Sequence, residues 1–253
     1  MSRFATTSWV TLYEPKPHAR FRLFCLPYAG GGPHIFCGWS DGLPKEVEVC
    51  PIQLPGRGSR IKETPFTNLL QLVGHLAQGL LPLMDKPFAF FGHSMGALIS
   101  FELARQLRRE RRVGPEVLFV ASRRAPQLPQ SSPQMHRLSD AGFIQALRFL
   151  GGMPEALFNQ PELLQLVLPI LRADVTLVET YVYQHEDPLD CPISAFAGKL
   201  GTDVSRYELE SWRKQTSQSF NLEMFPSNHF FLIDDRALLL QAITRDLSST
   251  FRL

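Results

Sequence analysis

One segment, residues 87–100, constrains the fold of this chain more than any other. Its apolar residues Phe88–Phe91 predict a short buried strand, and residues 97–107 continue with a helical pattern. Between them, residues 92–96 read Gly-His-Ser-Met-Gly and fit G-x-S-x-G, the sharp strand-to-helix turn called a nucleophile elbow. The flanking glycines allow close backbone approach, and the new helix offers free N–H groups to an anion. This context favours Ser94 as a nucleophile over an ordinary glycine-rich turn.

Length and composition indicate a single globular domain over residues 1–253. The chain has 44% hydrophobic and 20% charged residues, and its net charge of +2 favours neither nucleic acid nor a membrane surface as a partner. The N-terminus lacks the apolar core of a signal peptide, and no apolar run of about 18 residues could span a bilayer. The four cysteines show no C-x-x-C pair and no metal-ligand spacing, so we expect reduced thiols and a cytoplasmic protein.

Strand and helix patterns alternate along most of the chain. Strands are expected at 20–26, 47–52, 88–91, 117–121, 192–198 and 221–225, and helices at 69–84, 97–107, 208–216 and from 236 onward. This alternation predicts an α/β fold with a doubly wound, mostly parallel sheet. The polar, proline-containing residues 1–18 are expected to form an arm on the surface.

Residues 124–190 break this alternation. They contain no good strand pattern, and helical patterns occur at 140–150, 161–171 and 172–183. An insertion of this length is too long for a loop. We expect a helical lid over the carboxyl end of the sheet, where ligands of α/β sheets bind; the alternative is a peripheral subdomain.

A serine nucleophile needs a base, and seven histidines are available. His229 follows the last expected strand and a turn, where the chain order Ser…Asp/Glu…His of α/β-hydrolases places the base; a buried structural histidine is the alternative. His93 adjoins Ser94 and is expected to point away from it, while His34 could line a pocket. The remaining four are expected in solvated or boundary positions: His18, His75, His136 and His185.

The orienting carboxylate should follow the strand at 192–198, and Asp203 is the acid nearest that turn. Aspartate also caps turns and helix starts, so a structural role for Asp203 stays open. Asp174 and Asp190 are weaker candidates. A glycine-rich loop, residues 27–32, follows the first strand, where such enzymes place the second oxyanion donor.

Taken together, these segments resemble the type II thioesterases, stand-alone α/β-hydrolases that serve polyketide and non-ribosomal peptide synthetases. The resemblance runs from about Phe21 to the C-terminus. Its landmarks are Cys25-Leu-Pro-Tyr-Ala-Gly-Gly, Gln53-Leu-Pro-Gly-Arg-Gly, Pro65-Phe-Thr, Phe91-Gly-His-Ser-Met-Gly-Ala, Phe101-Glu-Leu-Ala, Ser122-Arg-Arg-Ala-Pro, Leu171-Arg-Ala-Asp and His229-Phe-Phe-Leu.

The resemblance implies roles for individual residues. Ser94 matches the family's nucleophile and His229 its base, while the backbone amides of Met95 and of Ala29 or Tyr28 match its oxyanion hole. The family usually places its acid three residues after the glycine that ends the strand; here Gly201 stands there, and Asp203 follows two residues later. Asn228 stands where the family more often has glycine. Either the loop is re-routed so that Asp203 reaches His229, or the triad is weakened.

The implied reaction is hydrolysis of acyl thioesters on the phosphopantetheinyl arm of acyl or peptidyl carrier proteins, by a monomer without a cofactor of its own. Carrier proteins are acidic, so the basic cluster at Arg105–Arg112 is either a docking surface or a solvated helix end. Alternative functions are release of medium-chain fatty acids from their carrier, a general esterase or lipase activity, and an inactive carrier-binding module, which the glycine at position 201 would fit.

Overall fold

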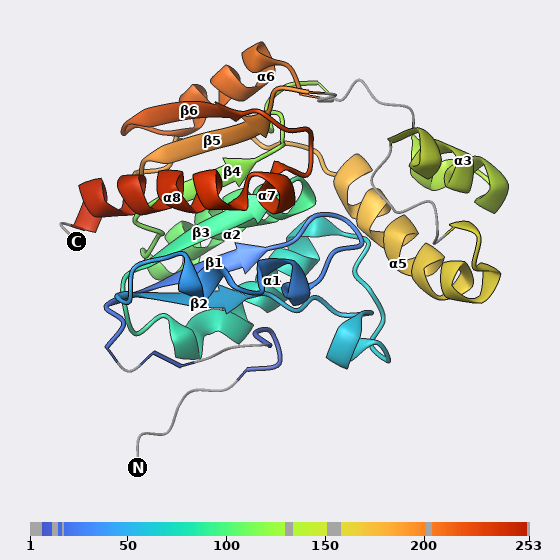
Figure 1. Cartoon of the computed structure of the whole chain (residues 1–253), viewed down its shortest axis with the longest axis horizontal. Helices are drawn as coiled ribbons and strands as arrows, with labels where there is room; N and C mark the ends of the chain where they lie inside the picture. Colours follow the sequence, from blue (N-terminus) through green and yellow to red (C-terminus); the bar gives the residue numbers. More distant parts are fainter. Residues whose placement is uncertain are drawn as a thin grey trace.

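A sheet of six parallel strands forms the centre of the computed structural model, which describes residues 7–11, 15–16, 18–129, 134–150, 158–200 and 204–251 (Figure 1). Within this part of the chain the strand order is β2-β1-β3-β4-β5-β6. The bounds are Phe21–Leu26 for β1, Val47–Pro51 for β2, Phe88–His93 for β3, Leu118–Ala121 for β4, Ile193–Gly198 for β5 and Phe220–Phe225 for β6. The predicted α/β-hydrolase fold class is confirmed.

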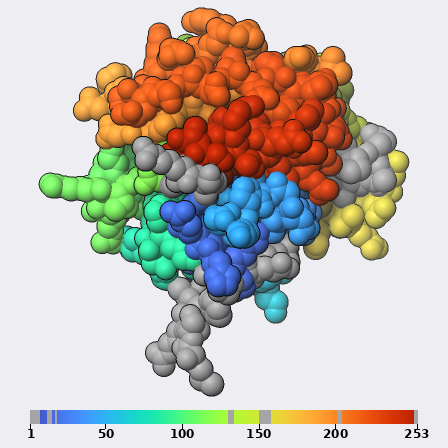
Figure 2. Space-filling view, turned by 60° about the vertical axis from the view of Figure 1, so that its left-hand side comes forward, coloured from blue at the N-terminus to red at the C-terminus, as the bar shows by residue number. Residues whose placement is uncertain are grey.

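Helices cover both faces of this sheet, which explains why β1 to β5 are buried along their whole length. Alternate residues of β1 enter different hydrophobic clusters: Phe24 packs with α1 (Leu69–Leu80) and α2 (Met95–Arg111), and Leu23 packs with α8 (Arg236–Phe251). Figure 2 shows α8 (red) lying against the N-terminal part of the chain (blue), and Gly42 is so close to Leu240 that a Cβ there would lie 2.5 Å from Leu240 Cδ1.

Two helices, α3 (Asp140–Leu150) and α5 (Pro161–Glu179), lie between β4 and β5 in the chain and side by side at one end of the sheet (Figure 1). They share a hydrophobic cluster of their own that contains Phe143, Leu147 and Leu171. The two helical patterns predicted at 161–171 and 172–183 form one helix, with Pro169 inside it. Shorter helices, α6 (Arg206–Glu210) and α7 (Phe231–Asp234), follow β5 and β6.

The N-terminal arm is less superficial than its composition predicts. Trp9 is buried in the cluster beneath α1, and Val10 forms an antiparallel bridge with Ile52. Gly79 of α1 makes this possible, because a Cβ there would lie 2.0 Å from the Trp9 ring. The expectation of a surface arm is therefore wrong at Trp9. In the part of the chain described here, no helix is long and apolar enough to cross a membrane.

Candidate active site

Ser94 lies at the turn between β3 and α2 in a conformation that non-glycine residues rarely adopt. Its φ is 53° and its ψ is −109°, and its amide donates to the carbonyl of Ala121 on the neighbouring strand at 2.8 Å. The flanking glycines are required: a Cβ on Gly92 would lie 2.2 Å from the carbonyl oxygen of Gly96, and one on Gly96 would lie 2.2 Å from that of Leu26. The strand, turn and helix predicted around Ser94 are thus present, with the strained backbone of an elbow.

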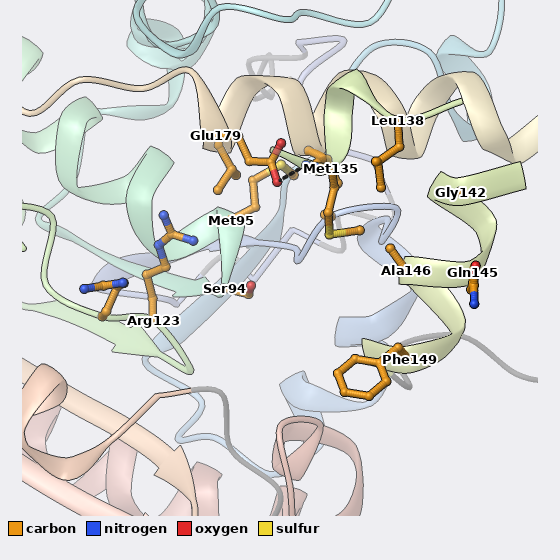
Figure 3. Close-up of a pocket in the computed structure, with 14 residues that line it drawn as sticks. Ser94, Met95, Arg123, Met135, Leu138, Gly142, Gln145, Ala146, Phe149 and Glu179 are labelled. Atoms are coloured by element: carbon orange, nitrogen blue, oxygen red, sulfur yellow. Dashed lines mark hydrogen bonds between the residues drawn. The ribbon is translucent and has the colours of Figure 1, made fainter. Parts of the chain in front are cut away.

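Ser94 opens into a cavity of about 630 Å³. Ala29 and Met95 border the cavity beside Ser94, and α3 and α5 contribute Phe149 and Val175 from the other side. Figure 3 shows Ser94 between the strands and α3, with the Phe149 ring on α3. Most of the lining is apolar; the polar exceptions are Ser94, Arg123, Arg124, Gln145 and Glu179. A largely apolar cavity that contains a few polar groups is typical of a small-molecule site.

Backbone amides with no internal partner stand at the wall of this cavity. Within the described residues, the amides of Ala29 and Met95 donate no hydrogen bond, and neither does that of Tyr28. Ala29 and Met95 line the cavity, whereas the Tyr28 ring packs against His93 and Phe230. Amides at a helix start and in a glycine-rich loop are suited to holding a developing oxyanion.

A buried ion pair fixes the glycine-rich loop. Arg57 donates to both carboxylate oxygens of Asp174 on α5, at 2.7 and 2.6 Å, and to the carbonyl of Gly31 at 3.1 Å. The same carboxylate accepts the amide of Gly30 at 2.7 Å. Gly30 has φ of 78° and lies against Leu171, so the loop, the segment after β2 and α5 meet at one point. The sequence did not predict this network; its only signal was that Arg57 and Asp174 each fall within a landmark segment.

His229 lies in the turn after β6, and two contacts join it to residues next to Ser94 in the fold. The Ser122 hydroxyl donates to the His229 carbonyl at 3.1 Å, and Ser122 directly follows Ala121, which holds the Ser94 amide. The His229 ring also packs edge-on against that of His93, with centroids 5.0 Å apart. Asn228 shapes the turn by accepting the amide of Phe230 at 2.8 Å. Both predicted residues, Ser94 and His229, therefore lie at the end of the sheet where its parallel strands finish.

His93 was expected to point away from Ser94, and its ring packs against that of His229. Its ring is fully buried and contacts the rings of His229, Tyr28 and Phe230. Burial, together with the proximity of His229, lowers the pKa of His93 well below its ordinary value, so this imidazole is neutral at pH 7. Because His93 is neutral, it places no positive charge next to the His229 ring.

The predicted orienting acid, Asp203, and the glycine at position 201 lie outside the described residues. The chain leading to them is hydrogen-bonded to the His229 turn: the amide of Lys199 donates to the Phe225 carbonyl at 2.8 Å, and that of Leu200 to the Ser227 carbonyl at 3.1 Å. Gly198 permits this approach, because a Cβ there would lie 2.1 Å from the Asn228 carbonyl oxygen.

The two weaker acid candidates are engaged elsewhere. Both carboxylate oxygens of Asp174 bind Arg57. Asp190 precedes β5 at the opposite edge of the sheet, where it borders a hollow beside Arg108. Neither is placed to orient His229.

The other histidines lie away from Ser94, with one departure from expectation. His18, His34, His75 and His185 are exposed. His136 was expected to be solvated, but its Nδ1 lies 2.6 Å from a carboxylate oxygen of Glu179 on α5, and the ring is mostly buried. That carboxylate group also accepts the amides of Met135 and His136, so this contact fixes the segment before α3.

In the basic cluster at Arg105–Arg112, three arginines are paired with acidic side chains, and the cluster is distant from Ser94. Arg105 is buried against Glu102, and Glu186 pairs with Arg105, Arg108 and Arg109. The cluster occupies the second half of α2, Met95–Arg111, and the rise of the helix places it about 15 to 25 Å from the elbow. This position favours the interpretation of the cluster as a solvated helix end over a docking surface for a carrier protein next to Ser94.

The parallel sheet, the serine at the elbow and the histidine after the last strand define a protein of the α/β-hydrolase class. A model of the thioesterase domain family matches residues 21–249. The chain belongs to this family.

Individual relatives agree over most of their length. The chain is 48% identical over 239 residues to the gramicidin S biosynthesis protein GrsT of Aneurinibacillus migulanus, covering 94% of this chain and 93% of that protein. The type II thioesterase BorB of the borrelidin biosynthetic cluster superposes with a TM-score of 0.84 at 35% identity, over 94% of this chain and 96% of BorB. The medium-chain S-acyl fatty acid synthase thioesterase of Rattus norvegicus is less similar, at 33% identity over 228 residues, 88% of this chain and 85% of that protein.

Proposed function

We propose that this protein is a serine thioesterase that removes acyl groups from the phosphopantetheinyl arm of acyl or peptidyl carrier proteins. It thereby clears stalled or mis-primed chains from polyketide or non-ribosomal peptide synthases. The observation that carries the proposal is the strained Ser94 at a largely apolar cavity, in a chain that matches antibiotic-biosynthesis relatives almost from end to end. The proposed setting is the cytoplasm, where the free cysteines stay reduced, and the proposed unit is a monomer.

In the acylation step, the Ser94 hydroxyl attacks the thioester carbonyl while the His229 imidazole takes the hydroxyl proton. The negative charge that forms on the carbonyl oxygen is held by the amides of Met95 and Ala29, with that of Tyr28 as the alternative to Ala29. The carbon–sulfur bond then breaks, and the pantetheine thiol leaves with the proton. His229 next activates water, which attacks the acyl-serine and releases the free acid. The reaction needs no cofactor of the enzyme's own.

The orienting acid is proposed to be Asp203. The support is that Lys199 and Leu200, which come shortly before it in the chain, are hydrogen-bonded to the end of β6 and to the His229 turn. A neutral His93 assists in a second way, because a cation there would repel the imidazolium that forms on His229.

The insertion at 124–190 is proposed to act as a lid that encloses the acyl group. Its support is the cavity wall, to which α3 contributes Ala146 and Phe149, α5 contributes Val178, and the segment before α3 contributes Leu138. These side chains are apolar and line the same cavity as Ser94, as a binding site for a hydrocarbon chain requires.

The test is direct. A carrier protein is loaded with acetyl and with longer acyl groups, and loss of the acyl mass is followed with wild-type enzyme and with Ser94→Ala. Hydrolysis by the wild type alone, fastest on short acyl groups, supports editing, whereas fastest hydrolysis of medium chains indicates the fatty-acid-releasing function. Binding of the loaded carrier without hydrolysis contradicts the proposal and supports the inactive carrier-binding module. A preference for oxygen esters over thioesters supports a general esterase.

A further inference from the structure

Arg123 is held rigidly beside the catalytic cavity. Its carbonyl accepts the indole N–H of the fully buried Trp212 at 2.7 Å, and the amide of the preceding residue, Ser122, donates to the Phe196 carbonyl at 2.8 Å. Arg123 therefore lies two residues after the end of β4, beside Ala121 and Ser122, which contact Ser94 and His229. Its side chain lines the cavity, and Figure 3 shows Arg123 and Phe149 on opposite sides of Ser94.

The guanidinium of Arg123 has no protein partner among the described residues. Its Nε is buried without a hydrogen bond, and its terminal nitrogens form neither a hydrogen bond nor an ion pair there. The neighbouring Arg124, by contrast, pairs with Glu208 at 3.3 Å. Among the described residues that line the cavity, Glu179 is the only carboxylate, and it is occupied by the amides of Met135 and His136 and by the His136 ring.

An unpaired guanidinium in an apolar wall is unfavourable, because its loss of hydration is not compensated. Burial and the proximity of Arg124 lower the pKa of Arg123 to about 10, so the group still carries its charge at neutral pH. A charge kept at a site with free donors and no counter-ion indicates a ligand that supplies the missing anion.

We propose that Arg123 binds an anionic group of the substrate, either a carboxylate on the acyl chain or the phosphate of the phosphopantetheine arm. Both groups are covalently tethered to the thioester carbon that reacts at Ser94, and both present the oxygen pair that a guanidinium binds in a bidentate manner. Arg123 is thus a specificity-determining residue. This inference rests on the proposed thioesterase function and adds a subsite to it.

The experiment compares matched small thioesters with wild-type enzyme, Arg123→Met and Arg123→Lys. Pentanoyl and glutaryl thioesters of N-acetylcysteamine differ by one carboxylate, and pentanoyl thioesters of pantetheine and phosphopantetheine differ by one phosphate. Loss of a charge-assisted contact should lower kcat/KM for the anionic member of one pair about 10- to 100-fold in Arg123→Met, with a smaller loss in Arg123→Lys. The neutral member should change by no more than about twofold. The pair that responds identifies the source of the anion.

Two controls separate this inference from the proposed function. Arg206 is exposed on α6 and pairs with Glu210 at 2.7 Å. Arg206→Met removes the same charge outside the cavity, and it should leave the ratio of kcat/KM between the anionic and the neutral thioester unchanged in both pairs. Thermal unfolding of each variant verifies that it is folded. If the wild type hydrolyses none of the thioesters, the proposed function fails. If it does hydrolyse them but Arg123→Met lowers kcat/KM equally for all four, or for none, the anion subsite is refuted.

Discussion

The ion pair between Arg57 and Asp174 should be required for turnover as well as for stability. In Asp174→Asn the side chain keeps its shape but loses its charge, and its NH₂ group faces a guanidinium N–H in place of an oxygen. Three short hydrogen bonds, at 2.6 to 2.7 Å, converge on this carboxylate in the wild type. Because Arg57 stays buried, the expected loss is about 3–5 kcal/mol in the free energy of unfolding.

The effect on catalysis follows from the bond that the Gly30 amide donates to Asp174. The amide of Gly30 adjoins Ala29, whose own amide borders the cavity. Removing one oxyanion donor lowers kcat by about 10²–10³-fold, so displacing the loop that carries it should lower kcat about 10- to 100-fold while KM stays nearly constant. The assay is steady-state hydrolysis of the pentanoyl thioester of N-acetylcysteamine, well below the Tm of each variant, alongside urea unfolding.

A matched control lies at the opposite end of β1 and β2, where these strands begin. Arg22 pairs with the buried Glu48 at 2.7 Å, and it also contacts Asp85, which stays in place when Glu48 is changed. Glu48→Gln should therefore destabilise the protein by less, about 1–3 kcal/mol, and leave kcat unchanged. The reasoning is refuted if Asp174→Asn keeps wild-type kcat, or if Glu48→Gln loses as much.

Three further outcomes are expected. The folded-state pKa of His93 lies below its unfolded value near 6.5, so the free energy of unfolding should fall as pH drops below about 6.5, by up to about 1.4 kcal/mol per pH unit. His93→Asn should reduce this slope in urea titrations between pH 7 and 5. Equal slopes for the two proteins would show that His93 is not the cause. Ser122→Ala removes the hydroxyl that holds the His229 carbonyl and should lower kcat about 3- to 10-fold with little change in Tm, whereas an unchanged kcat would show that the bond does not position His229. Arg109→Gln combined with Arg111→Gln should leave kcat/KM for a loaded carrier within about twofold of wild type, and a large loss would restore the docking role of this helix end.

Local patterns predicted the framework because the relevant physics is local. The strands are short apolar runs bounded by turn residues, and α1 follows an amphipathic pattern. In the structure Asn68 caps this helix by accepting the amide of Gln71 at 3.0 Å. The elbow is equally local, since two glycines and one strained serine lie within five consecutive residues, 92–96. The catalytic roles of Ser94, His229 and Asp203 remain predictions.

Contacts between distant residues gave no such signal. Arg57 and Asp174 are 117 positions apart, and nothing near either residue in the sequence indicates its partner. His136 was misjudged for the same reason, because its partner Glu179 lies 43 positions away. Two helical patterns were expected at 161–171 and 172–183, but the chain continues as one helix, whose Leu171 packs in the cluster shared with α3.

Pro169 divides α5 into two parts with different attachments. The C-terminal part carries Leu171 and Asp174, both of which contact Gly30. The part before Pro169 carries Leu163 and Leu166 with 42% and 61% of their surface exposed, and the proline lacks the N–H that would bond it to the preceding turn. The α5 residues that line the cavity, Val175, Val178 and Glu179, all lie in the part after Pro169. One attachment therefore fixes both the α5 wall of the cavity and the loop that carries Ala29.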